Sequence, residues 1–236
     1  MARIKPGIYL PSRLAELTSY IIPGEPMADI GSDHALLPCF LINQGICPRA
    51  IIGELTTGPF IRAQKTISLV GLTDRIETRQ GDGLDILSPG EVSTVVIAGI
   101  GAATITGILD RAGKKIESFK RLVLQPMGTL RDLRAFIAAR GWLIEAENVI
   151  KDTHYYVSIS INPVSGPLYN FSDLEMEFGP RILERHNESA IRDYLEYHLR
   201  KYQKIILQTS PVESSRAKNA VNIYKDRKIR LEEVLK

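Results

Sequence analysis

Short apolar runs alternate with helical patterns over roughly the first two thirds of this 236-residue chain. Such an alternation predicts right-handed βαβ units, in which parallel strands form a sheet covered by helices on both faces. The run Val95-Val96-Ile97-Ala98 is apolar without interruption, which is typical of a strand buried on both sides. We expect strands at 27–30, 50–53, 75–79, 94–98 and 121–124, and helices between them at 36–44, 59–70, 103–112 and 130–139.

The pattern changes after Gly141. Residues 142–149 and 155–161 have the composition of two strands without a helix between them, and the polar segment 150–154 that joins them is short. A short connection can join only antiparallel strands, so the sheet should end in a β-hairpin. A mostly parallel α/β sheet with this ending suggests the Rossmann-like sheet of class I methyltransferases, by analogy at the level of the fold.

The C-terminal part of the sequence predicts a helical hairpin. Residues 162–167 contain Pro and Gly and are typical of a linker. Beyond them, two stretches separated around Pro211 repeat their seam positions in steps of four and three, the spacing of a coiled coil. We therefore expect a methyltransferase-type domain over 1–162 and an antiparallel coiled-coil tail over 163–236. The expected seam is Ile191, Leu195, His198, Tyr202 and Ile205 in the first helix, and Ala217, Val221, Tyr224, Lys228, Leu231 and Leu235 in the second.

The composition limits the cellular compartment and the binding partners that we expect for this protein. Hydrophobic residues make up 44% and charged residues 24% of the chain, and the net charge of +3 permits nucleic-acid binding without requiring it. Cys39 and Cys47 form no CxxC pair, so we expect two buried thiols in a reducing compartment, with neither a disulfide nor a zinc site. The N-terminal segment lacks the apolar core of a signal peptide, and the run 95–109 is too short and too rich in Gly and Thr to span a bilayer. These features predict a cytoplasmic protein that binds neither a membrane nor a metal.

Polar or glycine-rich turns follow four successive predicted strands. In the first, Asp29 to His34, Gly31 would let the backbone approach a ligand closely. Glu54 ends the next strand, 23 residues after Gly31, where a carboxylate can accept hydrogen bonds from both ribose hydroxyls. The third turn is Gly81-Asp82-Gly83, in which Asp82 can accept a hydrogen bond from an adenine amino group. The fourth is 97–102, whose small residues would let a substrate approach the sheet.

Each of these turns, taken alone, also has a purely structural explanation. Asp-Gly is a common turn sequence, and Glu54 could simply open an exposed loop. Their joint placement carries more information, because the carboxyl ends of parallel strands share the edge at which open α/β sheets bind ligands. We therefore expect a ligand site at this edge.

An NAD-dependent enzyme is the main competing interpretation of such an edge. Its Gly-x-Gly-x-x-Gly motif is absent, because Asp33 stands where the second glycine should let a pyrophosphate approach. A carboxylate at that point would repel a pyrophosphate. S-adenosyl-L-methionine carries no phosphate, and its cationic sulfonium and amino groups suit acidic neighbours such as Asp29. The acidic edge therefore favours this methyl donor.

Five segments resemble the bacterial tRNA (adenine-N1)-methyltransferases of the TrmK family, which modify adenine 22 in the D-arm region. The segments are ADIGSDHALLP, GELTTGPF, RQGDGLDIL, IAGIGA and LVLQP, and the resemblance extends over nearly the whole chain, including the tail. The first two segments are specific to the family, whereas the fold is shared by many methyltransferases. Where the family usually has AGMGG, this chain has Ile100 and Gly101-Ala102, and we expect the extra methyl group of Ala102 to be tolerated.

The resemblance implies a set of cofactor-binding residues. The first turn would line the methionine end of S-adenosyl-L-methionine, Glu54 would hold the ribose, and Asp82 and Gly83 would contact the adenine ring. The full set is Asp29, Gly31, Asp33, His34, Glu54, Gly81, Asp82, Gly83, Ala98 and Gly99.

The implied reaction is methyl transfer to N1 of an adenine in tRNA. Because N1 carries its own lone pair, the enzyme must mainly place it in line with the sulfonium methyl group and exclude water. A carboxylate could stabilise the positive charge that develops on the ring, with Asp33 as the first candidate and Asp29 as the second. Asp33 could also cap the following helix, and His34 could bind either the base or local backbone. The expected catalytic residues are Asp33, His34 and Gly99.

Binding of tRNA requires phosphate contacts and a surface for the exposed base. Gln125 and Pro126 would border the base pocket, and Tyr155 or Tyr156 could cover the base or pack in the core. Basic residues occur near the N-terminus at Arg3, Lys5 and Arg13 and along the tail, where they alternate with acidic residues, so the tail is either an RNA-binding surface or a solvated coiled coil. The expected substrate-binding residues are Arg13, Gln125, Pro126, Tyr156, Arg200, Lys201 and Lys204.

Two alternative functions remain open at this point. One is a methyltransferase that acts on a small molecule or a protein and dimerises through the tail. The other is a non-catalytic protein that uses the same fold to bind RNA. We expect a monomer that binds S-adenosyl-L-methionine and tRNA.

Overall fold

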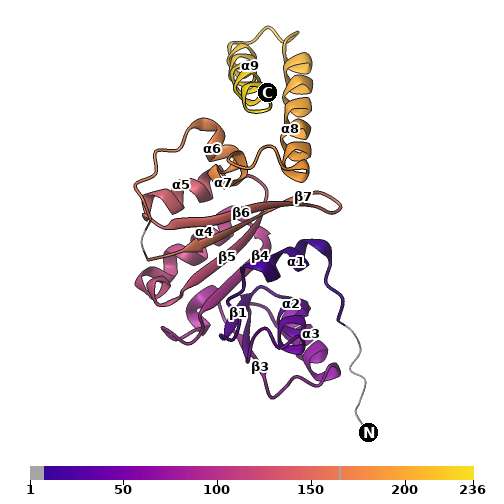
Figure 1. Cartoon of the computed structure of the whole chain (residues 1–236), viewed down its shortest axis with the longest axis vertical. Coiled ribbons are helices and arrows are strands. Elements are labelled where there is room, and N and C mark those ends of the chain that lie inside the picture. Colours follow the sequence, from indigo (N-terminus) through magenta and orange to yellow (C-terminus); the bar gives the residue numbers. More distant parts are fainter. Residues whose placement is uncertain (1–7, 165) are drawn as a thin grey trace.

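The computed structural model describes residues 8–164 and 166–236, and its centre is a seven-stranded sheet (Figure 1). The strand order is β3-β2-β1-β4-β5-β7-β6, in which β1 to β5 are parallel and β7 is antiparallel to both β5 and β6. This confirms the predicted mostly parallel sheet with an antiparallel end. The strands are β1 Met27–Ile30, β2 Ala50–Glu54, β3 Ile76–Gln80, β4 Thr94–Gly101, β5 Arg121–Met127, β6 Leu143–Lys151 and β7 Tyr155–Asn162.

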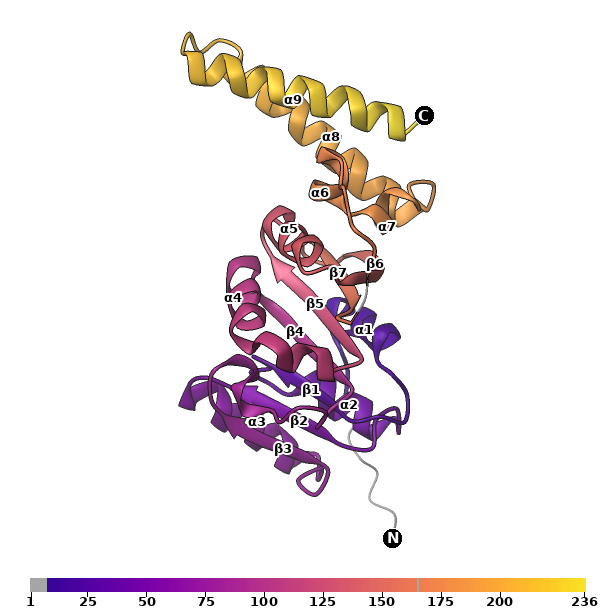
Figure 2. The same cartoon turned by 90° about the vertical axis from the view of Figure 1, so that its left-hand side faces the viewer.

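Helices cover both faces of the sheet (Figure 2). Val95 and Ile97 belong to the same core cluster as α4 and α5, whereas Val96 belongs to a second cluster with α1, α2 and α3. Neighbouring residues of β4 therefore enter opposite cores, which explains why this strand is apolar without alternation. The helices are α1 Ser12–Leu17, α2 Leu36–Asn43, α3 Thr57–Leu69, α4 Ala102–Ala112 and α5 Arg131–Ala139.

Two central strands extend beyond their predicted ends. β4 continues to Gly101 through a register shift between Ala98 and Gly101, and Gly101 pairs with Met127 of β5. Gly99 has a φ of +77°, a conformation that glycine adopts without strain, so the chain bends there and still remains in the sheet. The bend shifts the register of the last residues of β4 at the carboxyl edge of the sheet, beside the predicted substrate pocket.

The C-terminal tail is a helical hairpin, as predicted. Its long helices are α8 Ser189–Thr209 and α9 Ser215–Val234, and all the predicted seam residues are buried or half-buried. Two short helices that we did not predict, α6 Asp173–Phe178 and α7 Pro180–Leu183, connect β7 to the hairpin. The division at residue 162 coincides with the end of β7, but Phe178, Ile182 and Ile191 share a core cluster with the sheet. The base of the tail is therefore packed onto the sheet.

A buried ion pair reinforces this junction. Arg134 of α5 and Glu147 of β6 have fully buried side chains, and the Arg134 Nε donates a hydrogen bond of 2.9 Å to Glu147. The same guanidinium donates to the main-chain carbonyls of Met176, Glu177 and Phe178 at the end of α6. These bonds satisfy carbonyl groups that a helix end leaves without intrahelical partners.

Both cysteines are buried and unpaired, and burial raises the pKa of Cys39 to about 12 and that of Cys47 to about 11. Within residues 8–164 and 166–236, no helix has the length and apolar character needed to cross a membrane. The same residues contain no group of three or more His, Cys, Asp or Glu side chains arranged to hold a metal ion.

Candidate cofactor and substrate site

The sheet register brings the predicted turns to one edge. Ile30 pairs with Gly53 on one side and Ile97 on the other, and Glu54 pairs with Gln80. The turns that follow β1, β2 and β3 therefore leave the sheet side by side, next to the bend of β4 at Gly99. Main-chain hydrogen bonds from Gly31 to Gly53 (2.8 Å) and from Gly81 to Glu54 (2.9 Å) extend this alignment into the turns.

Asp29 is a buried carboxylate at the end of β1, with 5% of its surface exposed. Its Oδ2 accepts a hydrogen bond of 2.6 Å from the Ser32 hydroxyl. Burial, together with the charge of Glu54, raises the pKa of Asp29 from 3.8 to about 6, against the opposing effects of Ser32 and Arg13. A cation bound beside Asp29 would therefore stabilise its ionised carboxylate.

Glu54 lies next to this acid and is also buried. Its Oε1 accepts a hydrogen bond from the main-chain N–H of Asp33, which joins the end of β2 to the turn after β1. Burial raises the pKa of Glu54, and the Asp33 N–H and the charge of Arg62 act in the opposite direction. Among the described residues, its Oε2 receives no hydrogen bond, so one carboxylate oxygen is available to a ligand hydroxyl.

The Asp33 side chain does not cap the helix that follows it. The turn takes a left-handed conformation at Asp33 (φ 46°) and Ala35 (φ 55°), and α2 begins only at Leu36, without a side-chain cap. The interpretation of Asp33 as the N-cap of this helix is therefore wrong. Its carboxylate instead accepts a hydrogen bond of 2.6 Å from Arg62 Nε, and its Oδ2 lies 3.6 Å from His34 Nε2.

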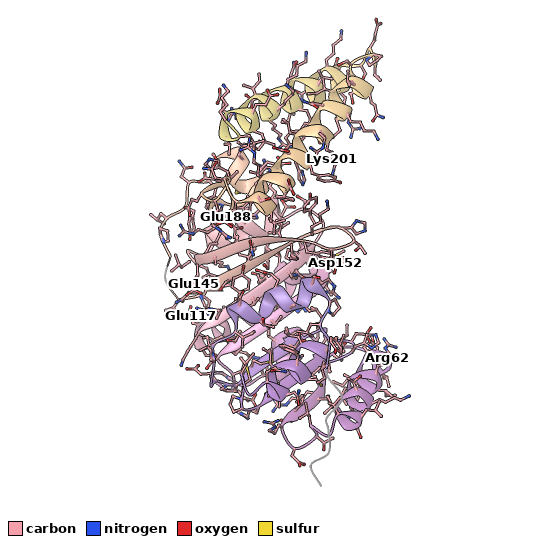
Figure 3. The ribbon with its side chains drawn as sticks, turned by 45° about the vertical axis from the view of Figure 1, so that its right-hand side comes forward. Arg62, Glu117, Glu145, Asp152, Glu188 and Lys201 are labelled. Atoms are coloured by element: carbon pink, nitrogen blue, oxygen red, sulfur yellow. The ribbon has the colours of Figure 1, made fainter. Side chains whose placement is uncertain are left out.

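Arg62 was not predicted as part of the site, although it provides the only salt bridge to Asp33 from another element among the described residues. It comes from α3 and is labelled in Figure 3. No sequence signal distinguishes it from other exposed helical arginines, because only the register of β1 and β2 brings α3 beside the first turn. His34 is more than half exposed, so it faces the space in front of the edge.

The third turn combines one exposed acid with two tightly packed glycines. Asp82 is half exposed and accepts a hydrogen bond of 2.8 Å from Arg111 of α4, a second arginine that the sequence did not indicate. A Cβ atom at Gly81 would lie 2.5 Å from Ile86, and one at Gly83 would lie 2.8 Å from Ile108. Packing therefore requires these glycines, whatever ligand the turn binds.

The predicted base pocket gathers residues from opposite ends of the chain. Gln125, fully buried at the end of β5, donates a hydrogen bond of 2.9 Å from its Nε2 to the carbonyl of Arg13 in α1. The Arg13 guanidinium lies 5.8 Å from the ring centre of Tyr156, and its Nη1 would be 3.7 Å from a Cβ at Gly99. The Oε1 of Gln125 has no hydrogen-bond partner among the described residues. A buried acceptor of this kind suits a ligand amino group.

The predicted phosphate-binding residues lie on the tail, across a groove from this pocket. Pro126, Tyr156, Arg200 and Lys201 all line the groove, whereas Lys204 does not. Arg3 and Lys5 lie outside the described residues. Four of the seven predicted substrate residues therefore line one groove. Arg13 and Gln125 do not line it, but Arg13 lies against Tyr156 and binds Gln125.

Comparison with known protein families shows to which family this chain belongs. The family model of TrmK, described as tRNA (adenine(22)-N(1))-methyltransferase, matches residues 27–233. The chain belongs to the TrmK family. This confirms the resemblance that the sequence analysis predicted over nearly the whole chain, including the coiled-coil tail.

Individual relatives agree with the family match. The tRNA (adenine(22)-N(1))-methyltransferase of Bacillus subtilis is 44% identical over 117 residues, which span 50% of this chain and 49% of that protein. The crystal structure of the B. subtilis m1A22 tRNA methyltransferase TrmK superimposes with a TM-score of 0.84 and 30% identity, covering 98% of this chain and 100% of that chain. A structure of M. capricolum TrmK in complex with S-adenosyl-homocysteine has a TM-score of 0.80 and 26% identity, covering 96% and 99%. The TrmK architecture is thus present from the sheet to the tail.

Proposed function

We propose that this TrmK-family chain transfers the methyl group of S-adenosyl-L-methionine to N1 of adenine 22 in tRNA. The observation that carries the proposal is the edge at which Asp29, Glu54 and Asp82 lie at or after the ends of three neighbouring strands, because three carboxylates without a glycine-rich phosphate loop suit a cationic nucleoside. The complex of M. capricolum TrmK with S-adenosyl-homocysteine supports the choice of cofactor.

The residues present fit this cofactor. Asp29, Gly31, Asp33 and His34 would surround the methionine end, and the available oxygen of Glu54 would accept from the ribose. The remaining contacts, to the adenine ring and to the reacting end, fall to Gly81, Asp82, Gly83, Ala98 and Gly99. When bound, S-adenosyl-L-methionine supplies an electrophilic methyl group.

The residues around Gly99 position the adenine of the substrate. Gln125, Pro126 and Tyr156 border the base, while Arg13 closes the pocket and excludes water. The lone pair of N1 forms the new bond to carbon as the bond from sulfur to that carbon breaks, and the ring takes on the positive charge. The carboxylate of Asp33, with Asp29 behind it, stabilises this charge. Arg62 keeps the Asp33 side chain oriented before the substrate binds.

The tail supplies the phosphate contacts. Arg200, Lys201 and Lys204 lie within about one turn of one another on α8, the helix that borders the groove. Lys201 is labelled in Figure 3. The protein acts on tRNA in the cytoplasm as a monomer with a tail that binds RNA. The buried, unpaired thiols of Cys39 and Cys47 agree with a reducing compartment.

The test is a methylation assay with unmodified bulk tRNA and labelled S-adenosyl-L-methionine, followed by mapping of the modified nucleoside by mass spectrometry. We expect N1-methyladenosine at position 22. Asp33→Ala should lower kcat by about ten-fold or more and change the cofactor Kd much less, whereas Asp74→Ala, an exposed acid before β3, should change neither. Cofactor binding without transfer to any tRNA would contradict the proposal and favour a small-molecule or protein substrate.

A further inference from the structure

A groove of about 740 Å³ separates the tail from the sheet. Its walls are α8, the turn between β6 and β7, and the loop from β5 to α5. Figures 1 and 2 show α8 next to the β6–β7 end of the sheet. The volume is within the range of sites that enclose a small organic ligand. Of the residues assigned above to the cofactor and the base, only Pro126 and Tyr156 line the groove.

Aromatic rings form one wall of the groove. Tyr155 packs against Tyr194 and Tyr197, with ring centres 5.3 and 5.2 Å apart. Tyr194 is buried, whereas 44% of the Tyr197 surface is exposed. Tyr197 therefore lines the groove with a ring that Tyr155 and His198 contact and that remains partly exposed. Such a partly exposed ring is a platform for stacking.

The charge of the groove is positive. Lys151 lies with its Nζ 5.6 Å from the Tyr155 ring centre, and Arg200 and Lys201 of α8 also line the groove. In the described chain, no carboxylate lies within 4.0 Å of the ammonium group of Lys151 or Lys201, and Arg200 approaches Glu196 only at 3.9 Å. The acidic residue among the lining side chains, Glu177, is paired with Arg227 at 3.3 Å. The groove therefore suits an anionic ligand that has an aromatic ring.

The groove is also continuous with the base pocket. Tyr156, which lines it, lies under the Arg13 guanidinium, and the Arg13 carbonyl is bound to Gln125. N1 is on the Watson–Crick edge, so the target adenine must leave its pair and its stack before it can react. The neighbouring base then loses a stacking partner, and an aromatic surface beside the pocket can replace that partner.

We propose that this groove holds a second, unstacked base of the tRNA, adjacent to the methylated adenine, which stacks on Tyr197 while Lys151 and Lys201 bind its phosphates. The proposal rests on the proposed function, since it takes tRNA as the substrate. A nucleotide explains the positive charge and the aromatic wall together, whereas an apolar peptide would leave the lysines without partners.

The first experiment compares Tyr197→Leu with Tyr197→Phe in the full-length protein. The affinity for an unmodified tRNA transcript is measured by fluorescence anisotropy at fixed salt. We expect Tyr197→Leu to raise the Kd about ten-fold and Tyr197→Phe to stay within about two-fold of the wild type, because only the ring is required for stacking. Cofactor affinity, measured by calorimetry, should be unchanged in both and confirms that the variants are folded.

A matched pair of lysine variants tests the phosphate contacts. Lys201→Gln should weaken tRNA binding and reduce its dependence on salt concentration, since one phosphate contact is lost. Lys114→Gln removes an exposed lysine from the segment that precedes β5, at the opposite edge of the sheet, and should leave both quantities unchanged.

The second experiment identifies the base that stacks on Tyr197, by testing whether removing a base and removing the ring have additive effects on the Kd. Transcripts carry an abasic nucleotide at one position on either side of adenine 22, and each is titrated with wild type and with Tyr197→Leu. We expect one abasic position to weaken binding to the wild type but to cause no further loss in the variant. The absence of coupling at every position tested, or an unchanged Kd for Tyr197→Leu, would overturn the inference.

Failure of the inference and failure of the proposed function are distinguishable. If the wild type methylates adenine 22 while Tyr197→Leu binds tRNA normally, only the groove assignment is wrong. If the wild type methylates no tRNA, the proposed function is wrong. A dimer in sedimentation velocity that Tyr197→Leu dissociates, with tRNA affinity unchanged, would assign the groove to a second copy and overturn the inference.

Discussion

Replacing Asp29 by asparagine tests whether the candidate cofactor site is built at the expense of stability. Asp29 is buried at the end of β1, and Ser32 donates the one side-chain hydrogen bond that its carboxylate receives from the described part of the chain. Burial raises its pKa from 3.8 to about 6, so the folded protein binds a proton at Asp29 more tightly than the unfolded chain does. The contribution of this group to the free energy of unfolding therefore falls as pH rises from about 4 through about 6.

The magnitude follows from the shift. Two pKa units correspond to about 3 kcal/mol of unfavourable free energy once Asp29 is fully ionised, since each unit is about 1.4 kcal/mol. Asparagine can still accept the hydrogen bond from Ser32, and it carries no charge at any pH. For a chain of this size, a gain of about 3 kcal/mol raises the Tm by roughly 6–12 °C. Asp29→Asn should therefore melt higher than the wild type at pH 7.5.

The assay is thermal unfolding of the ligand-free protein at several pH values between 4.5 and 7.5. The difference in Tm between Asp29→Asn and the wild type should be large at pH 7.5 and shrink toward zero at pH 4.5. Asp74→Asn, at an exposed position before β3, is the control and should give a small difference that does not vary with pH. A wild type as stable as the variant at pH 7.5, or a pH-independent difference, would refute the reasoning.

The same substitution should weaken cofactor binding. A cation beside Asp29 stabilises the ionised carboxylate, so S-adenosyl-L-methionine should bind the wild type more tightly as pH rises through about 6. Asp29→Asn should lose this dependence, and the cofactor should raise its Tm less than that of the wild type. A variant that is more stable and binds less well is the expected signature of a functional buried charge.

Three further substitutions test separate parts of the structure. Glu54→Gln should raise the cofactor Kd about ten-fold in calorimetry, because a charged acceptor for the ribose is lost, and an unchanged Kd would remove Glu54 from the site. Arg13→Ala should raise the KM for tRNA about ten-fold while the cofactor Kd stays constant; a change confined to the cofactor would contradict its place in the base pocket. Gly179→Ala should lower the free energy of unfolding by about 3 kcal/mol or more, because φ is +103° and the new Cβ would lie 2.3 Å from the Glu147 oxygens. Gly141→Ala, at a positive φ with nothing within 4 Å, should cost about 1 kcal/mol, and equal losses in denaturant titrations would contradict the packing argument.

The order of strands and helices was predictable because each strand is a short apolar run and each is followed by a polar turn. β4 illustrates the limit of this signal, since Val95 to Ile97 mark its start but the bend at Gly99 hides its continuation to Gly101. The short helix α1 gave no periodic signal, because its six residues make fewer than two helical turns. Tertiary contacts stabilise it instead, including a hydrogen bond of 2.6 Å between Glu16 and Asn148. The helix α6 did carry a signal that we missed, the capping box formed by Ser172 and Glu175.

The location of the site could be predicted, because the parallel strands end at a shared edge. The arginines that bind its acidic side chains could not be predicted from the sequence. Arg62 and Arg111 come from the helices α3 and α4, and in the sequence they look like any solvated arginine. Which helical side chain reaches an edge turn depends on where the helix begins and on how the chain turns before it. The conformation at Asp33 and Ala35 is an example, because it moves the start of α2 beyond the reach of the Asp33 side chain.

The position of the tail depends on a pair of charged residues, a residue type that is rarely fully buried. Arg134 shares the buried helix face of Leu133 and Ile137, and it binds Glu147 together with three carbonyls of α6. Breaking such a pair would leave a buried charge without a partner, so the junction strongly favours one arrangement. The groove beneath α8 is bounded on one side by elements of the sheet and on the other by elements of the tail. Its shape is therefore fixed before any ligand arrives, and a preorganised wall of this kind reduces the entropy lost when a flexible RNA strand binds.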